Sequence, residues 1–551
     1  MTSGAPIVQV DSLSVEVLGT TPPRMAVDSV SFQIHSNETL CLVGESGSGK
    51  SMIAHALIGL LPTHGVRHTG GTVSIEGREI TGLADDGLRA LRGKSVGMIF
   101  QEPMTSLNPL MTVAQQIDEV FRAHTSMTHS QRQAASLKLL SDVQIPDPAT
   151  AMAAYPFQLS GGQRQRVMIA MALALEPRLL IADEPTTALD VTTQAQILGL
   201  IRQLQVERGI AVLFITHDFG VVADIADRVL VMWQGRCVEA GTVQAVLQSP
   251  SDPYTRKLIR AVPKLVTSGG EGSLTQVPPA LLKVENLSKR YLGRGGRVTQ
   301  ALESVSLEVA PGETVGLVGE SGSGKSTLGK MAVGLLQPDS GAIFFEDQNI
   351  VGRTRKQMGA MRRQIQMIFQ DPYASLNPRH RIDDIIASGP MAAGVGRDAA
   401  YARAEELLRV VGMGSNCMRR FPHQFSGGQR QRISIARALA MQPKLLIADE
   451  AVSALDVSVQ AQVLALLREI RAEFGLSMLF ITHDLRVASG LCDRIAVMQA
   501  GRIVEIGAAA FICGSPKEAY TRDLVGAIPG KRRPLSPTLL AEPIASEYEK
   551  T

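Results

Sequence analysis

Two glycine-rich segments of the chain have the composition of a phosphate-binding loop. Each follows a short apolar stretch and has the pattern Gly-x-x-x-x-Gly-Lys-Ser. Glycines let backbone N–H groups close around phosphate oxygens, and the start of a following helix adds positive potential. The lysine is expected to reach the β- and γ-phosphates of a nucleoside triphosphate, and the serine hydroxyl to bind Mg²⁺. The loops are Gly44, Glu45, Ser46, Gly47, Ser48, Gly49, Lys50 and Ser51, and Gly319, Glu320, Ser321, Gly322, Ser323, Gly324, Lys325 and Ser326, with Thr327 after it.

An acidic pair ends an apolar run downstream of each loop, as Asp183-Glu184 and as Asp449-Glu450. Ligands of an open α/β sheet collect where the strands end, so the aspartate can hold Mg²⁺ through water. The adjacent glutamate is the candidate to polarise an attacking water. An isolated acidic pair is often only a solvated turn, but the glycine-rich loop upstream favours the catalytic interpretation.

A Ser-Gly-Gly-Gln segment opens a predicted helix in each half of the chain. Serine as the N-cap and two glycines expose several unpaired N–H groups, which makes a second anion site. A single such segment could equally be a simple helix cap. The residues are Ser160, Gly161, Gly162 and Gln163, and Ser426, Gly427, Gly428 and Gln429.

All of these motifs occur twice, in the same order. Lys325 follows Lys50 by 275 positions, and the other motifs recur at a steady spacing of 266 positions. We therefore predict two homologous domains, at residues 1–266 and 280–529. Glycine, serine and proline between them indicate a flexible linker at 267–279, and residues 530–551 are predicted to be a flexible tail.

The elements that must position these motifs belong to an α/β fold. Residues 30–34 and 305–309 alternate between apolar and polar side chains, as half-buried strands do. Continuous apolar runs at 179–182, 212–215 and 478–481 are typical of strands buried on both faces of a parallel sheet. Helices are predicted at 167–175, at 433–440 and around 404–411. Strands alternating with helices indicate an α/β architecture with an inserted helical part.

Composition excludes several classes of protein. The 551 residues are 45% hydrophobic and 19% charged, with a formal net charge of +3, so no nucleic-acid partner is expected. No apolar run approaches the roughly 20 residues that span a bilayer, and the N-terminus lacks the pattern of a secretory signal. The five cysteines form no Cys-x-x-Cys pair, which favours a reducing compartment. A soluble cytoplasmic protein is the starting expectation.

The motif set resembles that of ATP-binding-cassette (ABC) ATPases over nearly the whole chain. Besides the loops, acidic pairs and Ser-Gly-Gly-Gln signatures, Gln101 and Gln370 match the family's Q-loop, and His217 and His483 its switch histidine. The resemblance implies two tandem P-loop ABC ATPase domains, each with a RecA-like core, an antiparallel β subdomain and a helical subdomain. It also implies that Gln101 and Gln370 join the Mg²⁺ ligands Ser51, Asp183, Ser326 and Asp449.

The same resemblance assigns catalytic roles. Glu184 and Glu450 would be the catalytic carboxylates, and the two histidines would contact the γ-phosphate and the water. The family's arrangement implies that ATP on Lys50 is closed by the signature at Ser426, and ATP on Lys325 by the signature at Ser160. Neither half has lost a catalytic residue, so two hydrolytic sites are expected.

One position differs between the halves. Tyr291 resembles the aromatic residue that stacks on adenine in this family, whereas the matching place in the first half is Val17. Stacking of a base on an aromatic ring is worth about 1–3 kcal/mol in nucleic-acid complexes. We therefore predict weaker nucleotide binding at the Lys50 site.

Further segments resemble the dipeptide, oligopeptide and nickel importer ATPases. These are Ser-Leu-Asn-Pro after each Q-loop, and the endings Ser-Pro-x-x-Pro-Tyr-Thr-Arg at 249–256 and Ser-Pro-x-x-Ala-Tyr-Thr-Arg at 515–522. The resemblance implies two separate membrane permeases, which would dock on residues 102–158 and 371–424, and an extracytoplasmic solute-binding protein. It places the chain peripherally on the cytoplasmic face of the plasma membrane.

Two other kinds of cassette protein have features that this sequence lacks. Soluble tandem cassettes that act on ribosomes have a long, charged helical linker, whereas the linker here is short and carries a single charged residue, Glu271. DNA-repair cassettes carry a coiled-coil or zinc-module insertion, for which the sequence has no room. The transported solute stays open among peptides, glutathione, nickel chelates, opines and peptide antibiotics.

Overall fold

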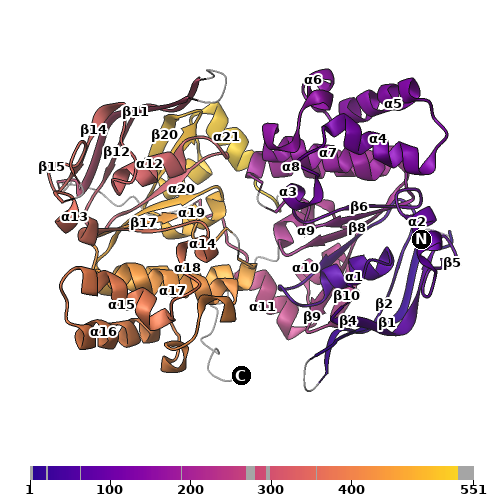
Figure 1. Cartoon of the computed structure of the whole chain (residues 1–551), viewed down its shortest axis with the longest axis horizontal. Helices are drawn as coiled ribbons and strands as arrows, with labels where there is room; N and C mark the ends of the chain where they lie inside the picture. The colour runs from indigo at the N-terminus through magenta and orange to yellow at the C-terminus, as the bar shows by residue number, and fades with distance from the viewer. Residues whose placement is uncertain are drawn as a thin grey trace. The chain divides into compact units, whose positions relative to one another are not determined.

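The chain folds into two compact units, seen here in a computed structural model (Figure 1). Residues 1–189 and 193–262 make up most of the first unit, and residues 263–528 most of the second. The structure describes residues 4–19, 23–62, 64–187, 189–267, 279–292, 298–354, 356–453 and 455–530. Apart from its two end residues, the predicted linker at 267–279 lies outside these ranges, as does the predicted tail beyond Gly530.

The first unit contains a six-stranded sheet in the order β10-β9-β3-β8-β7-β6. The strands from β9 to β6 are parallel, and β10 pairs antiparallel with β9 at one edge. A second, four-stranded antiparallel sheet has the order β2-β1-β4-β5. The strands are β1 (Val8–Val17), β2 (Arg24–Ile34), β3 (Thr39–Val43), β4 (Val66–Ile75), β5 (Arg78–Glu79), β6 (Val96–Ile99), β7 (Leu179–Asp183), β8 (Ala211–Thr216), β9 (Arg228–Trp233) and β10 (Arg236–Thr242).

Helices of the first unit fall into two groups. Between β6 and β7 the chain forms a helical part, in which α4, α5, α6 and α7 contact one another (Figure 1). Of the other helices, α1, α2, α8, α9 and α10 each follow a strand, and α11 follows α10. The first unit thus combines helices of both kinds. In chain order they are α1 (Lys50–Leu57), α2 (Asp85–Leu91), α3 (Pro103–Ser106), α4 (Val113–His124), α5 (His129–Asp142), α6 (Pro148–Ala153), η1 (Pro156–Gln158), α7 (Gly161–Leu173), α8 (Val191–Arg208), α9 (Phe219–Ile225), α10 (Val243–Gln248) and α11 (Pro253–Ala261).

The second unit repeats this design. Its sheets have the orders β16-β17-β18-β13-β19-β20 and β12-β11-β14-β15. Their strands are β11 (Leu282–Leu292), β12 (Val298–Val309), β13 (Thr314–Val318), β14 (Ser340–Phe345), β15 (Gln348–Asn349), β16 (Ile365–Ile368), β17 (Leu445–Asp449), β18 (Ser477–Thr482), β19 (Arg494–Gln499) and β20 (Arg502–Ala508). The helices are α12 (Lys325–Ala332), α13 (Gly359–Gln364), α14 (Pro372–Ser375), α15 (Ile382–Ala392), α16 (Arg397–Val410), η3 (Ser415–Cys417), η4 (Pro422–Gln424), α17 (Gly427–Leu439), α18 (Val457–Phe474), α19 (Leu485–Leu491), α20 (Ala509–Gly514) and α21 (Ala519–Gly526).

Burial follows the patterns read from the sequence. In β2, Val30, Phe32 and Ile34 are buried while the residues between them are exposed, which confirms a half-buried strand. Every residue of β7 and of β18 is buried, as expected of central parallel strands. The predicted helices are also confirmed, as α7, α17 and α16.

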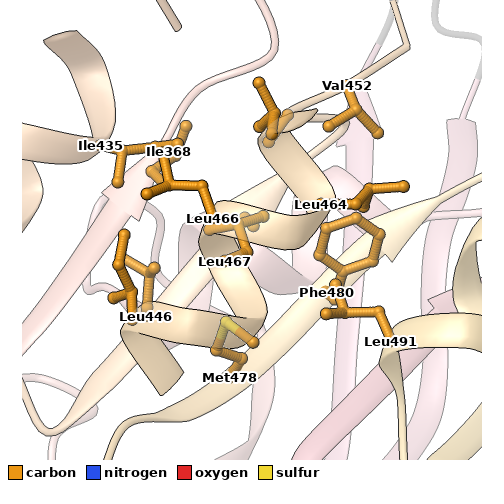
Figure 2. Packing of buried hydrophobic residues seen from close by; sticks show 14 of the residues in the cluster. Ile368, Ile435, Leu446, Val452, Leu464, Leu466, Leu467, Met478, Phe480 and Leu491 are labelled. Atoms are coloured by element: carbon orange, nitrogen blue, oxygen red, sulfur yellow. The ribbon is translucent and has the colours of Figure 1, made fainter. Parts of the chain in front are cut away.

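The core of the second unit lies between its parallel sheet and the helices beside it. Phe480 and Met478 on β18, Leu446 on β17 and Ile368 on β16 pack against Leu467 and its neighbours on α18 (Figure 2). Burying an aliphatic or aromatic side chain of this size contributes about 1.5–3 kcal/mol. These contacts fix the central strands, whose ends carry the predicted site residues.

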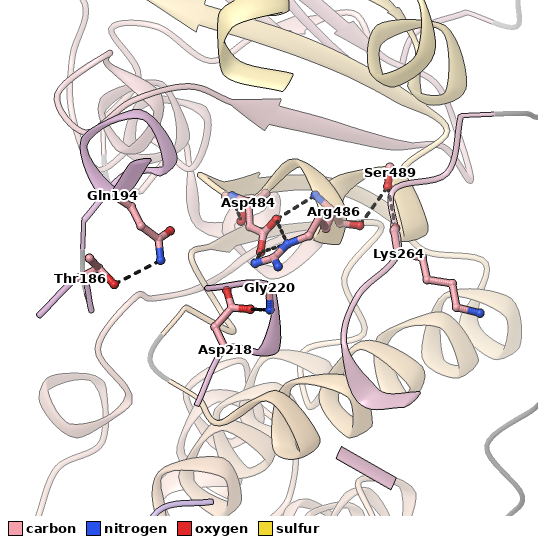
Figure 3. A network of polar contacts seen from close by, with 9 residues as sticks. Thr186, Gln194, Asp218, Gly220, Lys264, Asp484, Arg486 and Ser489 are labelled. Atoms are coloured by element: carbon pink, nitrogen blue, oxygen red, sulfur yellow. Dashed lines mark hydrogen bonds and ion pairs between the residues drawn. The ribbon is translucent and has the colours of Figure 1, made fainter. Parts of the chain in front are cut away.

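The chain that leads into the second unit is itself docked on that unit. Ser489 on α19 accepts a hydrogen bond from Val266 N at 3.1 Å and donates one to Lys264 O at 3.2 Å (Figure 3). Leu265 packs against the apolar core of the same unit. Residues 264–266 therefore lie on the second unit ahead of the predicted linker.

Candidate functional site

In each unit the predicted P-loop, switch histidine, acidic pair and Q-loop glutamine gather where four neighbouring parallel strands end. In the first unit β3, β8, β7 and β6 are adjacent, and the P-loop, His217, Asp183-Glu184 and Gln101 follow them in that order. In the second unit β13, β18, β17 and β16 are adjacent in the same way, and the corresponding site residues follow them. Because parallel strands direct their carboxyl ends to one edge of the sheet, residues far apart in the sequence meet there.

The P-loop is folded by contacts that only glycine permits at two points. Gly44 has φ +152°, and a Cβ there would lie 2.3 Å from Met232 O. Gly49 has φ +101°, and its Cβ would lie 2.2 Å from Ala26 O on β2. Neighbouring strands therefore press the loop backbone into a tight turn, which ends at the start of α1.

The P-loop lysines are buried and hold the loop together. Lys50 Nζ donates to Gly44 O and Glu45 O, both at 2.8 Å, and lies 3.4 Å from Ser48 Oγ. Lys325 Nζ repeats the pattern, with Gly319 O at 2.8 Å and Glu320 O at 2.7 Å. Burial disfavours the charged form of Lys325 and lowers its pKa, although nearby carboxylates such as Glu450 oppose the shift.

The serine and the aspartate predicted to bind Mg²⁺ contact each other in each unit, whereas the predicted glutamine ligands Gln101 and Gln370 donate to Glu184 and Glu450. Ser51 Oγ donates to Asp183 Oδ1 at 3.2 Å, and Ser326 Oγ donates to Asp449 Oδ1 at 2.8 Å. Burial raises the pKa of both aspartates, partly offset by these hydrogen bonds. A hydroxyl and a carboxylate side by side are oxygen ligands of the kind Mg²⁺ takes, so the donor set fits this ion.

The glutamates predicted to be catalytic sit at a strained backbone position. Glu184 has φ +46° and Glu450 has φ +47°, in the left-handed region that residues other than glycine, asparagine and aspartate rarely occupy. Such strain costs on the order of 1–3 kcal/mol and persists only where the surroundings impose it. No sequence signal announced this conformation.

Side chains from three different segments surround Glu184. Gln101 Nε2 donates to Oε2 at 3.1 Å, Thr187 Oγ1 donates to the same oxygen at 3.0 Å, and His217 Nδ1 lies 3.3 Å from Oε1. Burial opposes ionisation of Glu184, but the contacts with His217 and Thr187 and the charge of Lys50 outweigh it and lower its pKa to about 2. The carboxylate is therefore a fixed negative charge that can orient a water molecule.

Glu450 is held in a similar way, with one difference. Gln370 Nε2 donates to its Oε2 at 2.7 Å, and His483 Nδ1 lies 3.5 Å from Oε1. Ser453, which replaces Thr187, donates instead to the main-chain oxygen of Glu450 at 3.0 Å. Burial disfavours a charged His483, but Glu450 outweighs burial and raises the pKa of the histidine. The sequence did not predict that the hydroxyls of Thr187 and Ser453 donate to different oxygens of their glutamates.

The two histidines precede helices that an aspartate caps. Asp218 Oδ1 accepts from Gly220 N at 2.7 Å at the start of α9, and Asp484 Oδ1 accepts from Arg486 N at 2.8 Å at the start of α19 (Figure 3). An N-cap of this kind fixes the turn between strand and helix. The turn carries His217 or His483 at the carboxyl end of the strand.

The signature segments and the predicted adenine-stacking position lie on other elements. Ser160 and Ser426 are N-caps of α7 and α17, each in a reciprocal capping box with the glutamine three residues later. Tyr291 is 40% exposed near the end of β11, and Val17 ends β1. Closure of each ATP by the other half's signature, and stacking of adenine on Tyr291, stay predictions.

Models of two protein families match the chain. A model of the ABC transporter family matches residues 27–187 and again 302–453. A model of the C-terminal region of oligopeptide and dipeptide transporters matches residues 238–295, which include the first Ser-Pro-x-x-Pro-Tyr-Thr-Arg segment. The second such segment lies outside that match.

The chain is similar over nearly its full length to glutathione import ATP-binding proteins. That of Escherichia coli K12 is 47% identical over 95% of this chain and 89% of the relative, and that of Shigella flexneri is 46% identical with the same coverage. Among solved structures, a bacterial ABC transporter cassette in its dimeric form is 28% identical and covers 41% of this chain and 98% of its own, with a TM-score of 0.39.

Proposed function

The chain belongs to the ABC transporter family, as a protein with two ATPase cassettes, and from this premise we propose that it powers import of glutathione or related short peptides. The observation that carries the proposal is a complete set of ATP-site residues in both halves of a chain similar, over 95% of its length, to glutathione import ATP-binding proteins. The transporter C-terminal region supports peptide-type cargo and argues against the ribosome-acting alternative.

In the proposed mechanism each P-loop binds the phosphates of ATP. Lys50 and Lys325 would each exchange some of their loop carbonyl partners for phosphate oxygens. Because each lysine already lies against the loop that would hold the phosphates, this exchange requires only a small movement of its Nζ. Ser51 with Asp183, and Ser326 with Asp449, would hold Mg²⁺, aided by Gln101 and Gln370. The ion, when bound, neutralises charge on the phosphates.

Hydrolysis would use the fixed carboxylates. Glu184 and Glu450 would orient a water molecule for attack on the γ-phosphorus, which yields ADP and phosphate. His217 and His483, next to these carboxylates, can donate to the γ-phosphate. Fixed charges and donors that need no rearrangement during the reaction are usually the largest contribution to catalysis.

Partner proteins would supply the passage through the membrane. Among the residues that the structure describes, no helix is both long enough and apolar enough to cross a bilayer. We therefore propose that two separate permeases carry the solute and bind the helical parts at 102–158 and 371–424. An extracytoplasmic binding protein would deliver the solute, and the chain would sit on the cytoplasmic side of the membrane through its permeases.

Uptake by cells tests the proposal. Cells lacking this chain should lose uptake of labelled glutathione, and the native chain should restore it. The same chain with Glu184→Gln and Glu450→Gln, produced at equal level, should not. Uptake of labelled dipeptides measured in parallel separates the two kinds of cargo. Undiminished uptake of both in cells without the chain would refute the proposed function, and co-sedimentation with ribosomes instead of membranes would favour the alternative.

A further inference from the structure

The Tyr-Thr-Arg segments lie against the P-loops, a placement that the proposed function leaves unused. Tyr254 is the second residue of α11, and its hydroxyl accepts a hydrogen bond from Glu45 N at 3.3 Å. Tyr520 is the second residue of α21, and its hydroxyl accepts one from Glu320 N at 3.2 Å. The same contact thus recurs in both units.

The peptide group that the tyrosine contacts is the one that also binds the P-loop lysine. Gly44 O and Glu45 N belong to one planar peptide unit, which moves as a rigid body. Tyr254 accepts from its N–H, and Lys50 Nζ donates to its carbonyl at 2.8 Å. In the second unit the peptide between Gly319 and Glu320 lies in the same way between Tyr520 and Lys325. Rotation of this plane would therefore move the lysine.

The tyrosine is itself anchored to the edge of the six-stranded sheet. Glu239 on β10 accepts hydrogen bonds from Ser251 N at 2.7 Å and from Asp252 N at 3.3 Å, just before α11. Glu505 on β20 accepts from Lys517 N and Glu518 N at 2.9 and 3.2 Å, just before α21. A carboxylate that receives backbone N–H groups fixes where the helix begins, and so where the tyrosine points.

The hydroxyls are suited to a permanent acceptor role. Burial raises the pKa of Tyr520 to about 12, so its phenol stays neutral at physiological pH. The ring of Tyr254 packs on that of Trp233, with 5.6 Å between centroids. In the second unit Gln499 stands at the position that corresponds to Trp233.

We propose that Tyr254 and Tyr520 are positioning residues for ATP binding, each holding the P-loop peptide that carries the lysine-binding carbonyl. The C-terminal extension of each cassette thereby sets that cassette's own affinity for ATP. This inference rests on the assignment of the P-loops as the ATP sites. It gives the extension a role in the nucleotide site of its own unit, apart from any role toward the transported solute.

The single tryptophan of the chain allows a site-selective test. Trp233 lies beside Tyr254, so its emission is expected to report MgATP binding at the first site. In the full chain, Tyr254→Phe should raise half-saturation by MgATP about two- to tenfold, the range for loss of one hydrogen bond. Tyr520→Phe should leave this titration unchanged. A chain with Trp233→Phe and Gln499→Trp carries the reporter beside Tyr520. In that chain Tyr520→Phe should raise the half-saturation by MgATP, and Tyr254→Phe should leave it unchanged.

A matched control removes a tyrosine hydroxyl elsewhere. Tyr401 donates to Asp384 within the helical part of the second unit, and Tyr401→Phe should shift neither titration. In steady-state hydrolysis, Tyr254→Phe should raise KM for ATP and keep kcat within about twofold, whereas a merely structural lesion would lower kcat and the melting temperature together. If the tryptophan emission does not respond, binding of labelled ATP to chains with Lys325→Ala makes the same comparison.

Two results would overturn the inference. One is an unchanged half-saturation and KM in Tyr254→Phe, and the other is an equal shift in Tyr401→Phe. If the native chain did not bind ATP at all, the proposed function would be refuted instead. Failure of the inference and failure of the proposed function therefore give different results.

Discussion

The two glycines of each signature segment should respond differently to the same substitution. An ideal Cβ on Gly428 would lie 2.2 Å from Val459 Cγ1 on α18, far inside ordinary contact, whereas one on Gly427 would lie 3.8 Å from Leu455 Cδ2. The first unit repeats this difference at Gly162 and Gly161. Packing therefore requires the second glycine of each pair and leaves the first without a structural reason to be glycine.

These contacts set the expected changes in domain stability and in the rate of ATP hydrolysis. Overpacking by a methyl group costs about 1–3 kcal/mol, and alanine regains about 0.5–1 kcal/mol of helix propensity over glycine. Gly428→Ala should therefore destabilise its domain by up to about 2.5 kcal/mol, which lowers the melting temperature by up to roughly 10 °C. Gly427→Ala should be neutral or slightly stabilising. If the open face of Gly427 receives a phosphate, its methyl group should slow ATP hydrolysis at least about tenfold, because small misplacements of reacting groups are costly.

Thermal unfolding and ATPase assays on the full chain separate the two effects. Adding Val459→Ala to Gly428→Ala should restore stability, since the side chain that the new methyl group meets is then removed. Equal loss of stability in Gly427→Ala and Gly428→Ala would contradict the packing argument. Normal hydrolysis by Gly427→Ala would contradict the proposed role of the signature.

Further predictions concern differences between the halves. Val17→Tyr should strengthen ATP binding at the Lys50 site, and Tyr291→Val should weaken ATP binding at the Lys325 site. Each change should be about 5- to 150-fold if full stacking is gained or lost. ATP titration of chains in which the other site's lysine is replaced by alanine measures this, and equal affinities of the two native sites would contradict the prediction. Glu450→Gln removes the charge that does most to raise the pKa of His483. Burial, the largest effect, and Lys325 then lower this pKa against the smaller opposing effect of Asp484, so it should fall below its ordinary 6.5. NMR titration of the histidine checks the sign, and an unchanged pKa would refute the pairing.

Local patterns were sufficient to predict the fold and most of the site. The doubled P-loop fixed two α/β units, because a glycine-rich loop of this kind must lie between a strand and a helix. The apolar runs at β7 and β18 predicted buried parallel strands, and the acidic pairs were expected at the strand ends where they lie.

What sequence could not predict depends on tertiary placement. The left-handed backbone at Glu184 and the hydrogen bond from Thr187 belong to the turn after β7, where Glu184 N donates to Ile215 O on the neighbouring strand β8. The contact of Tyr254 with Glu45 joins residues 209 positions apart, and no spacing rule relates them. Predicted closure of each ATP by a signature from the opposite half involves two units at once and awaits experiment.

The most direct test of the account measures ATP turnover by the purified chain carrying both Glu184→Gln and Glu450→Gln. Loss of two carboxylates that orient water should lower hydrolysis by about 10²-fold or more, the range for such groups, and leave ATP binding nearly intact. Hydrolysis at the native rate in the double variant would remove both glutamates from the catalytic role and contradict the mechanism proposed for this chain.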